Sequence, residues 1–135
     1  MTPEEKQLLL RDLCGRQFYE TKVLSPWEKD GPCKLSAIDL TSSRQIRVFE
    51  DWFKVEEVKP YLRPMSSMTE GERKEYKSFI FTQHHEWDGH GTSTEYVEID
   101  DVERYVTWLN KHHFDYRGLI PMGLALEAPK DMYKN

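Results

Sequence analysis

The first recurring pattern of apolar and polar positions lies close to the N-terminus and has the spacing of a helical face. Its apolar positions are Leu9, Leu10 and Leu13. The residues before this face match a helix start, because Thr2 and Glu5 have the spacing of a capping box and Pro3 occupies the first helical position. Gly15 is a natural helix end. The pattern therefore predicts a helix from Pro3 to about Gly15.

Two later segments carry the same kind of start signal. Thr69 and Glu72 predict a capping box ahead of a short and mostly exposed helix, "GERKEYKSF". Asp100 and Glu103 predict the start of a third helix, over about 101–112. Apolar residues recur in this third helix at intervals of three and four, at Val102, Tyr105, Val106 and Leu109.

Between the first two helices the periodicity changes to that of strands. Short alternating or β-branched runs, separated by turn-forming residues, occupy 19–24, 33–40 and 44–49. In the second run the alternation slips by one position after Ala37, which is typical of a β-bulge. The two prolines of "VKPYLRP" (58–64) predict an edge strand or an extended segment. "FIFTQ" (79–83) is a candidate for a further strand.

This order of elements predicts an α+β fold. We expect an N-terminal helix, a small curved antiparallel sheet or partial barrel over about 19–64, and a C-terminal helix followed by an ordered tail. A chain of 135 residues has the length of one ordinary domain and buries roughly two-thirds of its unfolded surface. Because no repeat or long linker interrupts it, we expect a single domain spanning 1–135.

Charge narrows the choice of partners. The formal net charge of −5 makes nucleic acid an unlikely partner, because such proteins carry a basic surface that neutralises phosphates. The same acidity disfavours anionic membranes. Basic residues still cluster locally, around Arg44 and Arg47 and around Lys59 and Arg63.

The sequence also indicates a cellular location. The N-terminus lacks the basic start and apolar stretch of a signal peptide. The longest nearly apolar run, "LIPMGLAL" (119–126), is too short to cross a bilayer. Cys14 and Cys33 form no disulfide framework and are interpreted as small hydrophobic residues with reduced thiols, with a single Cys14–Cys33 bridge as the alternative. We therefore expect a cytoplasmic protein without a membrane segment.

The stretch "HHEWDGH" (84–90) raises the question of a metal site. Zinc requires imidazoles, thiolates or carboxylates that converge tetrahedrally at bonding distance. His84 and His85 are adjacent, so in a strand they point to opposite faces. His85, Asp88 and His90 can converge only if the loop folds around an ion. We predict a polar loop without a stoichiometric metal, and a metal site remains the alternative.

A second histidine pair lies in "HHFDYRGL" (112–119), where the third helix is predicted to end. A histidine beside an aspartate can support acid–base chemistry, but no nucleophile motif accompanies this pair. We predict instead that His113, Asp115 and Arg117 anchor the helix end and the following tail, with Asp115 capping the next turn. The alternative is that these side chains contact a ligand or partner.

The aromatic residues offer a possible contact surface. Most of them are expected in the core of a domain this small. Trp27 and Trp52 lie in turn-like stretches and are the better candidates for exposure. Several exposed aromatic side chains together would form a good protein-binding surface.

Two stretches carry a family resemblance: "EEVKPYLRPMSSMTEGERKEY" (56–76) and "WLNKHHFDYRGLIPMGLALEAPKDMY" (108–133). They resemble segments of a group of small uncharacterised proteins from phages, prophages and other mobile elements of gut anaerobic bacteria. The earlier part of the chain is similar to that group in layout. The resemblance implies an accessory protein of a phage or mobile element, expressed in a bacterial cytoplasm. It implies no activity, so it transfers no catalytic residue.

Three classes of function follow. We favour a non-enzymatic interaction module that binds a host or phage protein. The first alternative is a small-ligand binder of the nucleotide type, which would use Arg63, Arg117, histidines and stacked aromatics. The second is a metal-dependent hydrolase built on His84–His90. A structural or nucleic-acid-associated role is the remaining possibility.

The favoured function defines a set of candidate contact residues. They are Tyr61, Arg63, Trp108, His113, Asp115, Tyr116 and Arg117. No catalytic residue, metal ligand or cofactor is predicted.

Overall fold

The structure is a computed structural model, and it describes most of the chain. The described residues are 1–26, 32–41, 44–80, 84–87, 89, 93–96 and 99–133. At 80, 84–87, 93–96 and 99–101 the description covers the backbone alone.

Helix α1 (Pro3–Arg16) begins where the sequence predicts. Thr2 Oγ1 accepts from the Glu5 N–H at 3.1 Å, and a Glu5 carboxylate oxygen accepts from the Thr2 N–H at 3.0 Å, so the predicted capping box is confirmed. The predicted end is one residue too early, because Gly15 lies inside the helix. A Cβ atom at Gly15 would lie only 3.0 Å from Asn110 Nδ2, so glycine here allows close packing rather than ending the helix.

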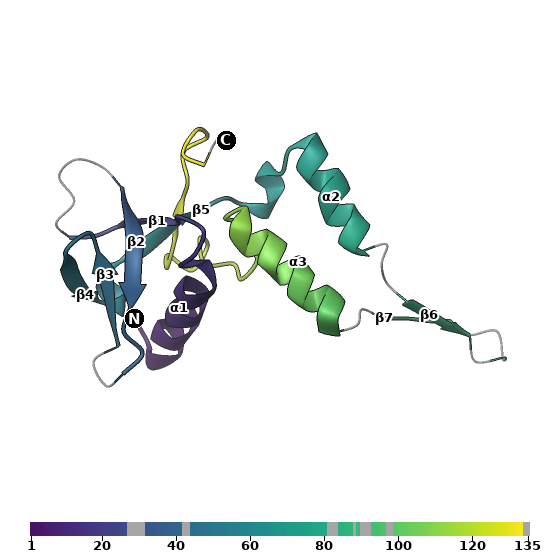
Figure 1. Cartoon of the computed structure of the whole chain (residues 1–135), viewed down its shortest axis with the longest axis horizontal. Helices are drawn as coiled ribbons and strands as arrows, with labels where there is room; N and C mark the ends of the chain where they lie inside the picture. The colour runs from purple at the N-terminus through teal and green to yellow at the C-terminus, as the bar shows by residue number, and fades with distance from the viewer. Residues whose placement is uncertain are drawn as a thin grey trace.

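Six strands form a curved, open sheet in the order β4-β3-β2-β1-β5-β8 (Figure 1). The strands are β1 (Lys22–Leu24), β2 (Cys33–Ile38), β3 (Gln45–Val48), β4 (Asp51–Lys54), β5 (Lys59–Leu62) and β8 (Leu126–Glu127). The first five are antiparallel neighbours, whereas β8 runs parallel to β5, so the sheet is mixed. The predicted bulge is confirmed as a register shift between Leu35 and Ala37.

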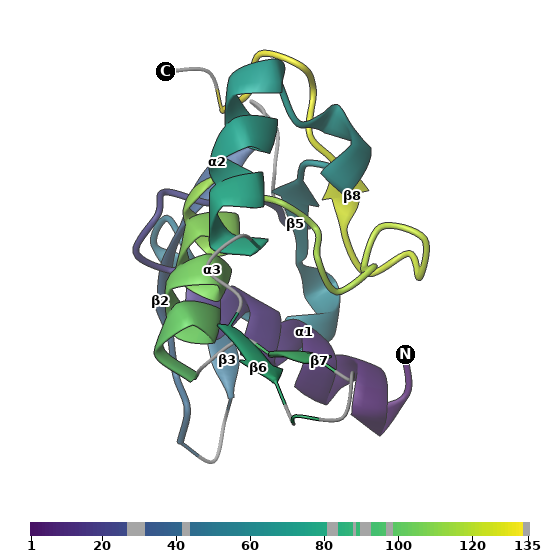
Figure 2. The ribbon, with the colours of Figure 1, turned by 90° about the vertical axis from the view of Figure 1, so that its right-hand side faces the viewer.

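Several local predictions are wrong. "VKPYLRP" is not an edge, because β5 lies between β1 and β8, which is seen beside it in Figure 2. Pro60 is tolerated inside the sheet opposite Val23. The strands β4 and β8 were not predicted. Phe79 lies in the last turn of helix α2 (Glu70–Ile80) rather than starting a strand, and residues 81–83 lie outside the described part.

Helix α3 (Ile99–Lys111) is confirmed as a helix, but its start differs from the prediction. Because the helix already includes Ile99, Asp100 lies inside the first turn instead of capping it. Two short 3₁₀ helices, η1 (Val55–Glu57) and η2 (Met65–Ser67), flank β5. Among the described residues, no helix has the length and apolar composition needed to span a membrane.

The buried apolar residues of the described part form two clusters. The larger lies between α1 and the sheet and includes Leu9, Leu13, Val23, Ile46 and Leu62. The smaller joins the ends of α2 and α3 and is centred on Trp108, Leu109 and Phe114. α1 lies between the sheet and α3 (Figure 1), and its close contact with α3 links the two clusters.

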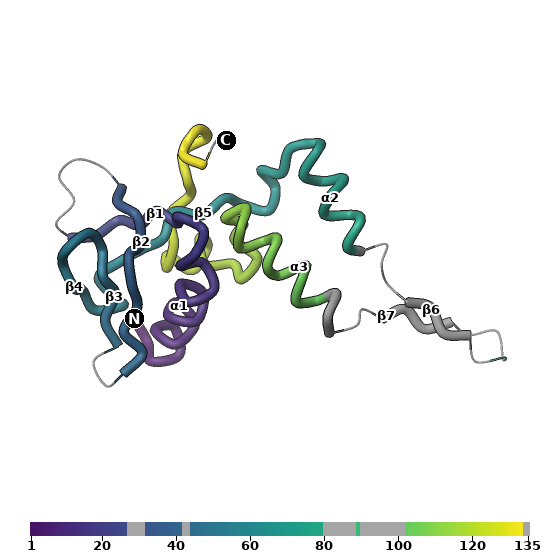
Figure 3. The backbone as a smooth tube through the Cα atoms, viewed as in Figure 1, coloured from purple at the N-terminus to yellow at the C-terminus, as the bar shows by residue number. Residues whose placement is uncertain are grey.

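A separate hairpin consists of β6 (His84–Trp87) and β7 (Ser93–Tyr96). The stretch predicted as a polar loop begins with strand β6, so the loop prediction is wrong at 84–87, whereas Asp88 and His90 lie outside the described residues (Figure 3). The predicted absence of a metal at 84–90 therefore stays a prediction. Trp27 also lies outside the described part.

Candidate functional site

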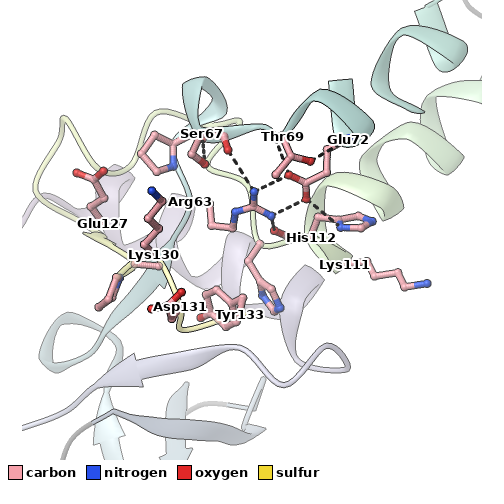
Figure 4. Close-up of a pocket in the computed structure, with 14 residues that line it drawn as sticks. Arg63, Ser67, Thr69, Glu72, Lys111, His112, Glu127, Lys130, Asp131 and Tyr133 are labelled. Atoms are coloured by element: carbon pink, nitrogen blue, oxygen red, sulfur yellow. Dashed lines mark hydrogen bonds and ion pairs between the residues drawn. The ribbon is translucent and has the colours of Figure 1, made fainter. Parts of the chain in front are cut away.

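An open pocket of about 770 Å³ lies where β5, η2, the start of α2, the end of α3 and the C-terminal tail meet (Figure 4). Its charged and aromatic walls include Arg63, Glu72, Lys111, His113, Lys130 and Tyr133. Two predicted contact residues, Arg63 and His113, belong to this lining, and the Arg63 N–H donates to the His113 carbonyl at 2.7 Å.

Arg63 is fixed by internal bonds. Its two terminal nitrogens contact the two oxygens of Glu72 at 2.7 and 2.6 Å, and its guanidinium lies 4.3 Å from the centre of the Phe114 ring. Figure 4 shows the two charged groups facing one another. The hydrogen bonds from Arg63 lower the pKa of Glu72 to about 2, so the pair stays ionised.

Glu72 also completes the predicted capping box of α2. Its carboxylate accepts from the Thr69 N–H at 2.9 Å, and its own N–H donates to Thr69 Oγ1 at 3.2 Å. A helix N-terminus beside an arginine is a natural place for an external anion. Here the Glu72 carboxylate occupies that place, so the pocket offers little extra attraction to a phosphate.

His113 ends α3 in an unusual backbone conformation. Its N–H donates to the Asn110 carbonyl at 3.1 Å, the Phe114 N–H donates to the Leu109 carbonyl at 3.0 Å, and His113 has a φ of 64°. This is the Schellman arrangement, in which glycine is the usual residue at that position. Histidine is strained in this backbone conformation, so we expect its side chain to form contacts that offset the strain.

That contribution is an anchor for the tail. The His113 ring stacks on the Tyr133 ring with centroids 3.6 Å apart, and its Nδ1 lies 3.4 Å from Thr21 Oγ1. Since the Thr21 hydroxyl donates its one proton to the Arg16 carbonyl, Nδ1 is the donor in this contact. Burial lowers the pKa of His113 to about 4, so the ring is neutral at physiological pH.

Tyr133 fixes the tail from the other side. Its hydroxyl donates to the Tyr61 carbonyl at 2.7 Å and accepts from the Lys22 N–H at 2.9 Å. Burial raises the pKa of Tyr133 to about 12, which keeps the hydroxyl protonated. Tyr61 therefore acts through its backbone carbonyl, and the docked tail supplies one wall of the pocket.

Asp115 has the predicted capping role. Its two carboxylate oxygens accept from the N–H groups of Leu119 at 2.8 Å and Ile120 at 2.9 Å, which confirms that it caps the turn after α3. Backbone bonds hold it in place, because the Asp115 N–H donates to the Arg63 carbonyl at 2.8 Å.

Arg117 and Tyr116 belong to a buried network that sequence reasoning missed. At its centre Arg16 and Asp12 form an ion pair at 2.8 Å, and both side chains are 0% exposed. Arg117 lies 3.5 Å from Asp12, and the Tyr116 hydroxyl donates to the Asn110 side chain at 2.9 Å. The sequence does contain a pattern that indicates this network, because Asp12 and Arg16 share one helical face with the apolar residues Leu9 and Leu13.

The seven predicted contact residues therefore separate into two groups. Arg63 and His113 line the pocket, whereas the other five are not among its lining residues: Tyr61, Trp108, Asp115, Tyr116 and Arg117. Trp108 is largely buried and donates its indole N–H to Glu75 at 2.8 Å. Most of these polar groups are thus engaged in holding the fold together.

The aliphatic hydroxyl groups that line the pocket are engaged within the fold. The Ser67 hydroxyl donates to the Pro64 carbonyl at 2.7 Å, and Thr69 Oγ1 serves the α2 cap, so neither hydroxyl faces an unengaged base. Within the residues that the structure describes, no group of three His, Cys, Asp or Glu side chains could hold a metal ion.

A second candidate surface lies at the other end of the sheet. The Trp52 side chain is 45% exposed, which confirms the expectation for this residue, and Phe49 is 72% exposed. Phe49 and Glu50 form the two-residue turn between β3 and β4, with φ at Phe49 of 60°. Two-residue hairpin turns favour glycine, asparagine or aspartate at such positions.

Comparison of the chain with family models, with curated proteins and with solved structures gave no match. Function is therefore inferred from the residues and their geometry.

Proposed function

We propose that the protein is a non-enzymatic interaction module of a phage or mobile element, which binds a host or phage protein in the bacterial cytoplasm. The observation that carries this proposal is Phe49, a large apolar side chain exposed at a turn position where its backbone is strained.

Neither local structure nor core packing explains Phe49. A φ near 60° costs a non-glycine residue roughly 1–2 kcal/mol, and the side chain recovers little of it because it is 72% exposed. Strain of this kind is typical of functional positions. The exposed Trp52 follows in β4, and tryptophan is enriched at the centres of protein interfaces.

The polar residues support a binding role over catalysis. Arg63 and Glu72 neutralise one another, Asp115 caps a turn, and His113 is stacked under the tail. Groups engaged in this way stabilise the fold and are poorly placed to transfer protons to a substrate.

A small-ligand function has one observation in its favour, the pocket of about 770 Å³, which is within the usual size of ligand sites. The Arg63–Glu72 pair removes the strongest attraction for a nucleotide. We therefore rank this function second. Thermal shifts with a panel of nucleotides test it, and a stabilisation that Lys111→Ala removes would reverse the ranking.

The main test is affinity capture from host lysate with the wild-type protein, the Phe49→Gly variant and the Val102→Ala variant. Val102 is an exposed apolar residue on α3 and serves as the matched control. We expect a captured protein that Phe49→Gly loses and Val102→Ala retains. Because glycine relieves the turn, Phe49→Gly should leave the melting temperature unchanged or raise it. Equal capture by Phe49→Gly, or no captured protein, contradicts the proposal.

A further inference from the structure

The side of the sheet that faces away from α1 has a defined chemistry. In β3 and β4, the cross-strand pair Ile46–Phe53 is buried, whereas the adjacent pair Arg47–Trp52 is exposed. Because side chains alternate along a strand, Lys54 lies on the same side as Trp52. Lys34 in β2 is also exposed, next to the buried Leu35. We call the residues Lys34, Arg47, Trp52 and Lys54 the outer face.

The outer face is basic in an acidic protein. The charged residues of the first four strands are Lys22, Lys34, Arg47 and Lys54 against Asp51. Four positive charges and one negative charge give +3, whereas the whole chain has −5. The rest of the chain therefore carries the acidity, and these strands form a local basic region.

These cations have few internal partners. Lys34 contacts Glu20 at 3.1 Å, but with side chains 58% and 75% exposed this pair contributes little. For Arg47 and Lys54 the described part of the chain shows no ion pair, although the charge of Lys54 also acts on the nearby Glu56 carboxylate. Both side chains are exposed, so their charges can attract an anionic partner.

Trp52 gives this basic region an apolar centre. It lies directly across from Arg47, and cross-strand neighbours stand about 5 Å apart, so a bound segment can contact both at once. Tryptophan and arginine are the residue types that most often dominate interface energetics.

We infer that the outer face binds an acidic segment of the partner protein, with an apolar side chain of that segment on Trp52 and its carboxylates on Arg47 and Lys54. This inference rests on the proposed function and specifies its partner. It also gives Phe49 a place, because the strained hairpin tip adjoins the same strands.

A protein segment fits this surface better than a nucleic acid. Glu50 and Asp51 are exposed at the hairpin tip beside Phe49 and would repel a continuous phosphate backbone. The net charge of −5 would add repulsion at longer range. A peptide can place an apolar or basic residue beside Glu50 and Asp51 and carboxylates beside the cations.

The test is a fluorescence anisotropy titration with three labelled probes: a peptide of alternating Glu and Leu, a length-matched peptide of alternating Lys and Leu, and an oligothymidylate. We expect saturable binding of the acidic peptide, weakened by salt because the contacts are ionic. Trp52→Ser and Arg47→Glu should each reduce its affinity about tenfold, as loss of a central interface residue does. Lys77→Glu on α2, an exposed charge outside the sheet, is the matched control and should retain affinity.

The outcomes separate this inference from the proposed function. If the partner captured from lysate depends on Phe49 but survives Arg47→Glu, and the acidic peptide does not bind, the inference is wrong while the interaction role stands. Binding of the oligothymidylate or of the basic peptide as tightly as the acidic peptide also overturns it. Circular dichroism of each variant verifies that the fold is retained.

Discussion

The buried Asp12–Arg16 ion pair of α1, which contacts the segment after α3, should be the most sensitive point of the fold. Arg16 is fully buried, and its guanidinium contacts Asp12 Oδ2 at 2.8 Å, Asp12 Oδ1 at 3.1 Å and the Phe114 carbonyl at 2.6 Å. Its Nη1 has no hydrogen-bond partner among the described residues. The carboxylate of Asp12 compensates the positive charge of Arg16. We predict that Asp12→Ala lowers the free energy of unfolding by about 3–5 kcal/mol, because it leaves a desolvated cation.

Removal of the cation instead of the anion should lower the free energy of unfolding by less. In Arg16→Met, Asp12 keeps a cation, because Arg117 lies 3.5 Å away. The double variant Asp12→Leu/Arg16→Met removes both charges, and we expect it to be within about 1 kcal/mol of the wild type, since apolar residues of similar volume often replace a buried pair without loss. This order of effects distinguishes an unpaired charge from a simple packing defect.

Urea denaturation followed by circular dichroism gives the free energies. The control is Glu56→Gln, which breaks an exposed ion pair with Lys6 at 3.6 Å and should change stability by less than about 0.5 kcal/mol. A loss below about 1 kcal/mol for Asp12→Ala would refute the reasoning, because it would mean that water reaches Arg16 in solution.

Three further predictions concern the segment after α3. Asp115→Ala should lower the free energy of unfolding by about 1–2 kcal/mol, measured by urea denaturation, because two backbone N–H groups lose their acceptor. The pKa of His113 in the folded protein is lowered to about 4, so as the pH drops the unfolded chain takes up this proton before the folded protein does. The free energy of unfolding should therefore fall as the pH drops from about 6.5 to about 4, and His113→Gln should remove this component of the pH profile. Tyr133→Ala should release the tail and accelerate tryptic cleavage after Lys130, whereas Tyr133→Phe, which keeps the ring stacked on His113, should be cleaved more slowly than Tyr133→Ala.

Features that depend on residues close together in the sequence could be predicted. The capping boxes at Thr2 and Thr69 and the cap by Asp115 each need only residues three to five positions apart. Helix α3 could be found because its apolar period extends over several turns. These elements fix the order of helices and strands, and that order was sufficient for the fold class.

Features that depend on distant pairing could not be predicted. The place of β5 inside the sheet is set by β8, a two-residue strand that pairs with it from more than sixty positions away, too short for any periodic pattern. The ion pair between Glu72 and Arg63 could not be predicted either. The cap that Glu72 forms is local in sequence, whereas this ion pair depends on how α2 packs beside β5. The residues that line the pocket are brought together by these distant contacts, so no local sequence pattern indicates the pocket.

For a related physical reason, the sequence could not show which candidate contact residues have partners within the fold. Charged and aromatic residues near a turn can serve either a partner or the fold, and the sequence does not show whether their polar atoms are already bonded. Trp108 and Asp115 prove to be bonded internally. By contrast, β4 was missed because the turn before it has Phe49 where hairpin signals require glycine or asparagine. Phe49 therefore concealed the hairpin in the sequence, and neither the turn nor the core explains its presence. A position that departs from local sequence preferences without a structural compensation is where selection for an external contact is expected.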